Sequence, residues 1–402
     1  MLRRICLLCL LVALVAIPAA AQDDWFVMLF NAMTREFVRV NADGSQETYT
    51  LDLPENQYIG ARDIAFSPDG SRIAFCVVEY GENNQNVTTL HVRELASGTS
   101  IVAHDLGSSI GCRVTASEDF SQLAVALIRY YSGDPSVDTS LLSWELLVMD
   151  STTGQMLYAL NSDTPLAAAI SYTYGETFLP YVLRFSEGEV IFGEVPYGTE
   201  FPPDFPIYLW QLDADTLERT EGWGYPFPDF LESTGELAVL GQDPSLPAGE
   251  PMGPVPINNI VTVTDASGAS QVVYHNPDDV LVTVEFIDSG ERLMLQLVES
   301  FDPNNPDEFP GTYWLALDRQ GNVEELFSTD GFAFLTAAPD GFLVFSTESN
   351  TLPATYTLDY HGEGGVNTLL SLESENYGSW EIAYVSPASP AEDLPPFTPI
   401  TP

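Results

Sequence analysis

Histidine, the residue type that most often carries acid-base catalysis and binds zinc, is sparse in this sequence. The four histidines, His91, His104, His275 and His361, are scattered, with no His-x-x-x-His or His-Glu pair, which argues against a zinc site. Residues 107–111 read Gly-Ser-Ser-Ile-Gly and match the Gly-x-Ser-x-Gly pattern of serine hydrolases. That pattern works only as a turn from a strand into a helix, whereas a strand-like run follows here. We interpret the match as chance and predict no catalytic residue.

One loop carries the oxygen atoms that calcium prefers. The segment from Asp302 to Glu308 reads DPNNPDE, but it lacks the glycine and the ligand spacing of an EF-hand. We therefore expect no cofactor and no metal, and keep calcium at this loop as the alternative.

The charge balance narrows the classes of partner. The chain has 58 Asp and Glu against 13 basic residues, all of them Arg, for a formal net charge of -45. Nucleic acid is excluded as a partner, because affinity for phosphates depends on neutralising them with Lys and Arg. With 45% hydrophobic residues the chain can still bury a core, so we expect a folded acidic protein.

Residues 1–21 have the organisation of a secretory signal peptide. Arg3 and Arg4 precede an apolar run from Ile5 to Ile17, and small residues follow where a signal peptidase cuts. The run is shorter than the roughly 20 residues that a membrane-spanning helix requires, and no comparable run follows it. We expect a secreted or extracytoplasmic protein, in the periplasm or at the cell surface, with no membrane span.

A unit of about 50 residues repeats along the remaining chain. Its clearest copy, Ile64–Phe75, reads as an apolar strand, a Pro-Asp-Gly turn and a second apolar strand. Related copies contain Phe286–Gly290 and Ala338–Gly341. Between them a second hairpin recurs, in which a strand ending in Asp leads into a short turn with Gly, as in Met149–Gly154 and Leu317–Gly321. Two hairpins per unit give four antiparallel strands, which is the blade of a β-propeller.

These hairpins, and Phe66–Phe75 above all, resemble the TolB-type, WD-like propeller repeat of exported bacterial proteins. The resemblance covers residues 25–387 and implies a propeller fold. The helical domain that precedes the propeller in TolB has no counterpart here, so only the repeat is carried over and not the role of TolB.

The strand count predicts how the ring closes. Three strands open the chain, at Trp25–Phe30, Phe37–Asn41 and Gln46–Thr50, and a lone strand, Trp380–Val385, follows the last complete unit. Pairing the lone strand with the first would complete a blade and remove an open sheet edge. We predict an all-β fold, a seven-bladed β-propeller of four-stranded antiparallel blades over residues 22–387, with six or eight blades as alternatives. Residues 388–402, of which five are Pro, are predicted to be a disordered tail or a linker.

Two cysteines, Cys76 and Cys112, remain after the signal peptide. Aligned on the repeat, both lie at the same height in neighbouring blades, and the expected compartment is oxidising. They are candidates for an inter-blade disulfide, and two separate buried thiols are the alternative.

The long insertions of the repeat fall on one side of the predicted ring. They connect second and third strands, or successive blades, so they crowd one rim, where binding groups usually concentrate. The candidate binding residues on this rim are Tyr130, Tyr131, Tyr197, Phe205, Asp302 and Phe309. Aromatic faces beside carboxylates suit sugars or cationic peptides, although such loops also fold over their own aromatic side chains.

We therefore expect a monomeric, exported, non-enzymatic propeller that acts as a scaffold for a protein or carbohydrate partner. One alternative is a hydrolase or lyase at the channel mouth, which needs two carboxylates about 5 to 9 Å apart in a pocket. Another is the gating-type propeller module of a peptidase system. A fold alone does not decide between them.

Overall fold

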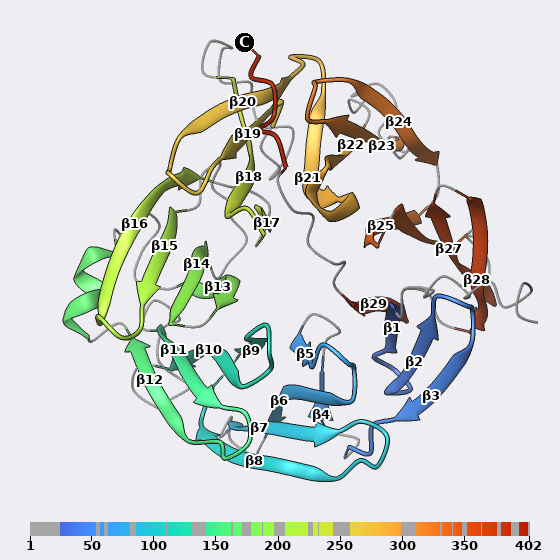
Figure 1. The fold of residues 1–402 in the computed structure, drawn as a ribbon. Helices are drawn as coiled ribbons and strands as arrows, with labels where there is room; N and C mark the ends of the chain where they lie inside the picture. The colour runs from blue at the N-terminus through green and yellow to red at the C-terminus, as the bar shows by residue number, and fades with distance from the viewer. Residues whose placement is uncertain are drawn as a thin grey trace, which may run out of the picture.

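The computed structural model of the chain describes residues 25–53, 57–59, 63–80, 86–109, 111–130, 142–161, 164–170, 178–186, 188–196, 206–223, 228–231, 233–243, 258–298, 311–329, 332–339, 341–347, 352–362, 364–375, 379–386 and 394–400. Within these residues the strands form seven antiparallel sheets arranged in a ring (Figure 1). The predicted seven-bladed propeller is confirmed.

Each blade contains four strand positions, counted from the channel outward. Blade 1 holds β29 (Trp380–Val385), β1 (Phe26–Asn31), β2 (Glu36–Asn41) and β3 (Gln46–Thr50). Blade 2 has an inner position split between β4 (Gln57–Tyr58) and β5 (Ile64–Phe66), followed by β6 (Arg72–Tyr80), β7 (Asn86–Glu94) and β8 (Ser100–Gly107). Blade 3 holds β9 (Gly111–Ala116), β10 (Gln122–Tyr130), β11 (Leu142–Asp150) and β12 (Met156–Asn161).

The remaining blades follow in chain order. Blade 4 holds β13 (Phe178–Ser186), β14 (Glu189–Pro196), β15 (Pro206–Gln211) and β16 (Thr216–Trp223). Blade 5 holds β17 (Asp229–Leu231), β18 (Glu236–Gly241), β19 (Ile260–Thr264) and β20 (Ser270–His275). Blade 6 holds β21 (Val280–Ile287), β22 (Arg292–Val298), β23 (Thr312–Asp318) and β24 (Val323–Thr329). Blade 7 holds β25 (Phe332–Ala338), β26 (Gly341–Thr347), β27 (Ala354–Gly362) and β28 (Gly365–Ser374).

Two short 3-10 helices, η4 (Pro165–Ala169) and η5 (Asp288–Gly290), interrupt this all-β pattern. In the described part of the chain, no helix has the length and apolar character needed to cross a membrane.

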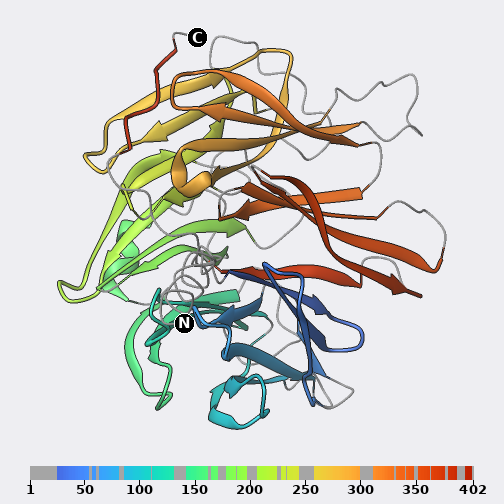
Figure 2. The same cartoon turned by 45° about the vertical axis from the view of Figure 1, so that its right-hand side comes forward.

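The two ends of the propeller meet in blade 1, as the strand count predicted. β29 pairs antiparallel with β1, from Val27 opposite Val385 to Asn31 opposite Trp380 (Figure 2). A latch follows this ladder, because the Phe26 N–H donates to the Ser386 hydroxyl at 2.8 Å and the Ser386 N–H donates to the Phe26 carbonyl at 2.9 Å. Every side chain of β1 is buried, so this pairing also covers an apolar strand.

The first hairpin of a blade is shaped by an aspartate. In blade 2 the Asp69 carboxylate accepts hydrogen bonds from the Ser67 hydroxyl at 2.6 Å and the Ser71 N–H at 3.0 Å, and Gly70 adopts a left-handed φ of +68°. The Ser67 bond is the main reason that the pKa of Asp69 falls to about 2. These local bonds explain why the Pro-Asp-Gly motif marks the turn so clearly in the sequence.

The hydrophobic core lies between neighbouring blades. One cluster joins Leu90 and Val92 of blade 2 to Leu123 and Val125 of blade 3. The same interface contains a disulfide between Cys76 on β6 and Cys112 on β9, with Cα atoms 6.1 Å apart.

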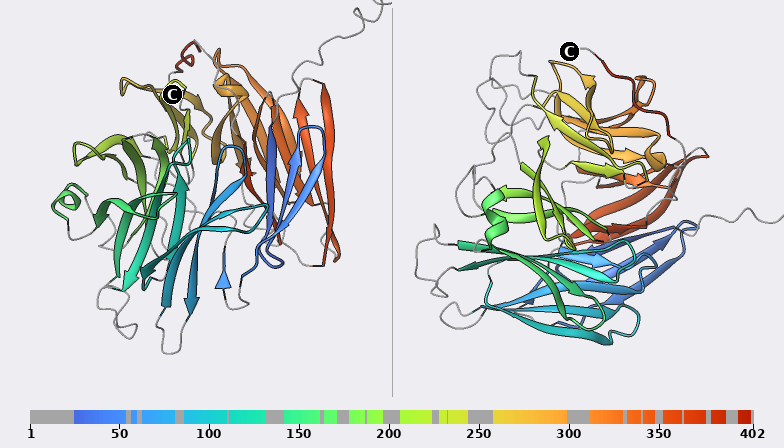
Figure 3. Two further views of the ribbon diagram at one scale, coloured as in Figure 1. Left: turned by 60° about the horizontal axis from the view of Figure 1, so that its bottom comes forward. Right: turned by 60° about the vertical axis from the view of Figure 1, so that its left-hand side comes forward.

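The C-terminal segment differs from the prediction. The sequence predicts a disordered tail or a linker over residues 388–402, and within this range residues 394–400 lie against blades 5 and 6 (Figure 3). Phe397 is 2% exposed and belongs to the core cluster between these two blades. A proline-rich composition indicates an extended chain; it does not exclude docking through one aromatic side chain and the backbone.

Candidate functional site

The rim predicted from the sequence is largely outside the described residues. Five of its six candidate residues are outside the described part of the chain: Tyr131, Tyr197, Phe205, Asp302 and Phe309. The loop considered for calcium is also outside it. Tyr130 is the last residue of β10, and its side chain is likewise outside the description. The rim therefore stays a prediction.

The central channel is bordered by the innermost strand of each blade (Figure 1). An innermost strand has a sheet neighbour on one side only, so its channel-facing N–H groups need another acceptor. In blades 5 and 6 that acceptor is a carboxylate. The Asp229 carboxylate on β17 accepts the Phe286 N–H of β21 at 2.6 Å, and the Glu285 carboxylate on β21 accepts the Ala337 N–H of β25 at 2.9 Å.

These two carboxylates form one electrostatic unit. Burial raises the pKa of Asp229 to about 6, against the opposing effect of N–H groups that donate to it. Burial is also the main reason that the pKa of Glu285 rises to about 7, and the nearby charge of Asp229 raises it further. Hydrogen bonds from the Ala337 N–H and the Thr336 hydroxyl act in the opposite direction. The pair can therefore take up or release a proton near neutral pH.

Glu285 also borders a cavity of about 330 Å³ at the inner strands of blades 6, 7 and 1. Phe334 and Ile382 give it apolar walls, and Thr336 and Tyr384 add hydroxyl groups. Burial raises the pKa of Tyr384 to about 12, so this hydroxyl remains protonated at physiological pH. A pocket of this size, with one ionisable carboxylate and apolar walls, suits a cationic side chain or a small amine.

The arginines of the channel are already engaged. On blade 3, Arg113 lies 3.7 Å from Asp63. On blade 4, Arg184 forms an ion pair with Glu189 at 2.8 Å, and its guanidinium lies 4.4 Å from the centre of the Phe230 ring. Among the described residues on the innermost strands, Asp229 and Glu285 are the acids with a pKa raised to near neutrality.

The residues considered for catalysis do not assemble into a site. Ser109 of the Gly-x-Ser-x-Gly match is fully buried, and its hydroxyl shares a hydrogen bond of 2.6 Å with Thr88. Burial lowers the pKa of His91 to about 4. Among the described residues, no group of three or more His, Cys, Asp or Glu is placed to hold a metal ion.

Asp229 and Glu285 were not among the residues predicted from the sequence. Each is an acid in an innermost strand, and each is followed by the last two residues of that strand, both of them apolar. That interruption of the apolar pattern is the signal that could have identified them.

Comparison with known proteins supports the fold. No protein-family model matches the chain, and no curated protein matches it. Among solved structures it resembles a prolyl endopeptidase, with a TM-score of 0.54 and 11% identity over 89% of this chain and 50% of the other. It also resembles prolyl oligopeptidase B from Galerina marginata, with a TM-score of 0.51 and 14% identity over 89% of this chain and 52% of the other.

An acylaminoacyl peptidase from Pyrococcus horikoshii is similar as well, with a TM-score of 0.50 and 13% identity over 83% of this chain and 47% of the other. The chain thus spans about half the length of these three peptidases. At such low identity the likeness shows the fold alone. The chain is a seven-bladed β-propeller, and its resemblance to the TolB-type repeat stays a prediction.

Proposed function

We propose that this chain is an exported, non-enzymatic propeller that binds a peptide or protein partner, and that the channel cavity beside Glu285 accepts a cationic group of that partner. Export is proposed on the signal-like residues 1–21. The observation that carries the binding role is the cavity itself, in which a carboxylate stands at the edge of apolar walls.

The charge of the molecule supports a cationic ligand. A net charge of -45 attracts basic segments and accelerates their association, while repelling acidic ones. Glu285 then provides a local partner for one ammonium or guanidinium group. Its raised pKa means that a bound cation stabilises the ionised form, so binding near neutral pH releases a proton.

The carboxylate pair is better suited to binding than to hydrolysis. Both acids accept hydrogen bonds from the backbone of the next blade, which fixes them to the channel wall. A hydrolase or lyase would need the two acids on either side of a scissile bond, with one free to donate its proton.

Titration calorimetry with two peptides tests the binding role. The probes are a blocked Lys-containing pentapeptide and the same peptide with norleucine at the Lys position. With a pKa of about 7, Glu285 is about one-tenth ionised at pH 6 and about nine-tenths ionised at pH 8, so we expect the Lys peptide to bind roughly tenfold more tightly at pH 8.

The Glu285→Gln variant supplies the control, since it should lose this pH dependence. Equal binding of the two peptides, or an unchanged pH dependence in the variant, would contradict the proposal.

A second candidate is a propeller module that works with a separate peptidase. It is favoured by the likeness to the propellers of prolyl and acylaminoacyl peptidases. Affinity capture from culture fluid, with and without calcium, tests this candidate. Recovery of one stoichiometric partner with peptidase activity would support it, whereas turnover of a peptide or glycan panel by the purified propeller would support the hydrolase or lyase alternative.

A further inference from the structure

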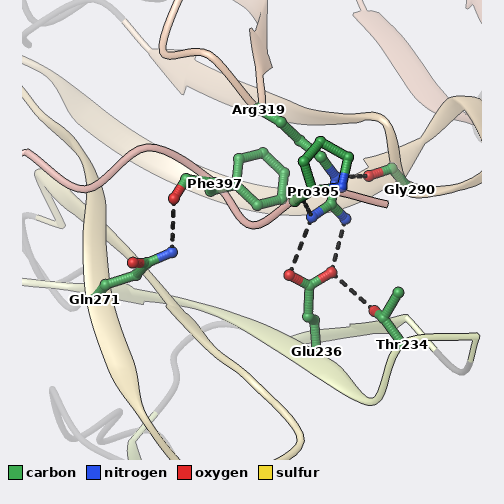
Figure 4. Close-up of polar contacts among 7 residues, drawn as sticks. All are labelled: Thr234, Glu236, Gln271, Gly290, Arg319, Pro395 and Phe397. Atoms are coloured by element: carbon green, nitrogen blue, oxygen red, sulfur yellow. Dashed lines mark hydrogen bonds and ion pairs between the residues drawn. The ribbon is translucent and has the colours of Figure 1, made fainter. Parts of the chain in front are cut away.

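The C-terminal segment, residues 394–400, occupies a groove between blades 5 and 6 (Figure 4). Within it Phe397 is buried, whereas Pro395, Pro396, Thr398 and Pro399 are exposed. The segment belongs to no sheet and runs as an extended chain. It is thus held by the Phe397 ring, by its backbone and by the Thr398 hydroxyl, which donates to the Arg319 carbonyl at 3.1 Å. Short linear motifs are usually bound in this way.

The Phe397 ring enters a pocket shared by the two blades. The guanidinium of Arg319, in the turn between β23 and β24, lies 4.3 Å from the ring centre. The ring of Phe286 on β21 lies 6.3 Å away, centre to centre. An aromatic ring between a cation and a second ring is a typical anchor for a bound peptide.

The peptide backbone is recognised on both sides of this anchor. The Thr398 N–H donates to the Arg319 carbonyl at 2.8 Å, and the Ile400 N–H donates to the Val272 carbonyl on β20 at 2.9 Å. The Gln271 side-chain amide donates to the Phe397 carbonyl at 2.9 Å, and the Arg319 guanidinium donates to the Pro395 carbonyl at 2.6 Å. These hydrogen bonds recognise the extended backbone of the segment and depend little on the identity of its side chains.

The pocket is held in shape by groups that do not belong to the tail. Arg319 donates two hydrogen bonds to the Glu236 carboxylate, at 3.1 and 2.7 Å, and a third to the Gly290 carbonyl at 2.9 Å. Thr234 donates to the same carboxylate at 2.8 Å. The side chains of Arg319 and Glu236 are 3% and 9% exposed, so this ion pair is a buried structural element of the interface between blades 5 and 6.

We propose that this groove is a docking site for a short extended peptide with a phenylalanine between prolines, and that residues 394–400 are its ligand within the same chain. A partner protein that displays such a segment binds here by displacing the tail. The site lies between two blades at the turns of their hairpins, and it is separate from the channel cavity that the proposed function uses.

Tethering explains why the tail occupies its own site. A weak linear-motif contact, with a dissociation constant of the order of 10 to 100 μM, is nearly saturated when its ligand is held at an effective concentration in the millimolar range. The same motif on a partner competes once the tail is weakened.

A labelled synthetic peptide of residues 393–402 (DLPPFTPITP) tests the proposal by fluorescence anisotropy. The full-length Phe397→Ala chain, whose own tail has lost its anchor, should bind this peptide at least tenfold more tightly than the unaltered chain. A control peptide with Ala in place of Phe should not bind. Adding Gln271→Ala to the Phe397→Ala chain should weaken binding several-fold, because it removes the donor to the peptide carbonyl.

Thr398→Pro provides a second route, since it removes the Thr398 N–H and hydroxyl, both of which donate to the Arg319 carbonyl, and keeps Phe397. Near-UV circular dichroism checks that each variant is folded. If folded Phe397→Ala and Thr398→Pro chains both fail to bind the peptide at 1 mM, the groove serves only its own chain and the proposal is wrong. Equal binding by the unaltered chain and both variants would also overturn it, because the tail and the peptide would not share a site.

Discussion

Replacing Glu285 with Gln changes a carboxylate that is disfavoured as an anion into a neutral group of nearly the same shape. The Gln carbonyl can still accept the Ala337 N–H and the Thr336 hydroxyl that Glu285 accepts. The substitution thus isolates the effect of ionising this group inside the channel.

The magnitude follows from the pKa of Glu285. Folding raises it from 4.5 to about 7, and each pKa unit corresponds to about 1.4 kcal/mol. The neutral form is therefore favoured in the folded state, and its contribution to the unfolding free energy is complete below about pH 4 and is lost as the pH rises through about 7. Glu285 is only partly buried, so solvent screening reduces the free energy that this pKa shift represents. We expect ionisation of Glu285 to lower the unfolding free energy by about 1 to 2 kcal/mol.

The assay is urea unfolding followed by tryptophan fluorescence at pH 5 and pH 8. We expect Glu285→Gln to exceed the unfolding free energy of the unaltered chain only slightly at pH 5, where most of the contribution remains, and by about 1 to 2 kcal/mol at pH 8. Glu325→Gln, at an exposed site on β24 of the same blade, is the control and should show no such difference. A Glu285→Gln chain that is less stable at pH 8 than the unaltered chain would refute the reasoning.

Three further predictions concern the closure of the ring, the disulfide and a tight backbone contact in blade 7. Ser386→Ala removes the acceptor for the first N–H of β1, and we expect urea unfolding to show a loss of about 1 to 2 kcal/mol. Peptide mass spectrometry without reduction should find Cys76 and Cys112 in one linked species, whereas two alkylatable thiols would contradict the disulfide. Gly341→Ala would bring a Cβ atom to 2.1 Å from the carbonyl oxygen of His361, a backbone atom that cannot rotate away. We expect this variant to lose about 3 kcal/mol or more, or to accumulate unfolded, and a melting temperature near that of the unaltered chain would contradict the steric argument.

The architecture could be predicted because its determinants are local and repeated. The Ile64–Phe75 hairpin carries its own turn chemistry, in which Asp69 and Gly70 fix the backbone. The closing strand was also visible, because Trp380–Val385 had no partner within its own region of the sequence while the first blade lacked a strand. Pairing one excess strand with one missing strand needs no knowledge of side-chain packing.

The channel acids and the docked tail could not be predicted in the same way. A local pattern can mark Glu285 as an acid in an innermost strand, but its raised pKa depends on burial and on Asp229, which lies in another blade. The position of Phe397 depends on a pocket made by Arg319 and Phe286, which are distant in sequence. The rim residues were predicted from loop length, and they lie outside the described residues.

The joining of β29 to β1 has a consequence for how the chain is made. The latch residues Phe26 and Ser386 are 360 positions apart, so the first strand emerges from the ribosome long before its partner exists. Until then β1, which is apolar from Phe26 to Phe30, has an unpaired edge, and such an edge is the kind of surface that recruits neighbouring chains into aggregates. We therefore expect nascent molecules to need protection from one another, by a holding chaperone or by slow delivery, until β29 has been synthesised.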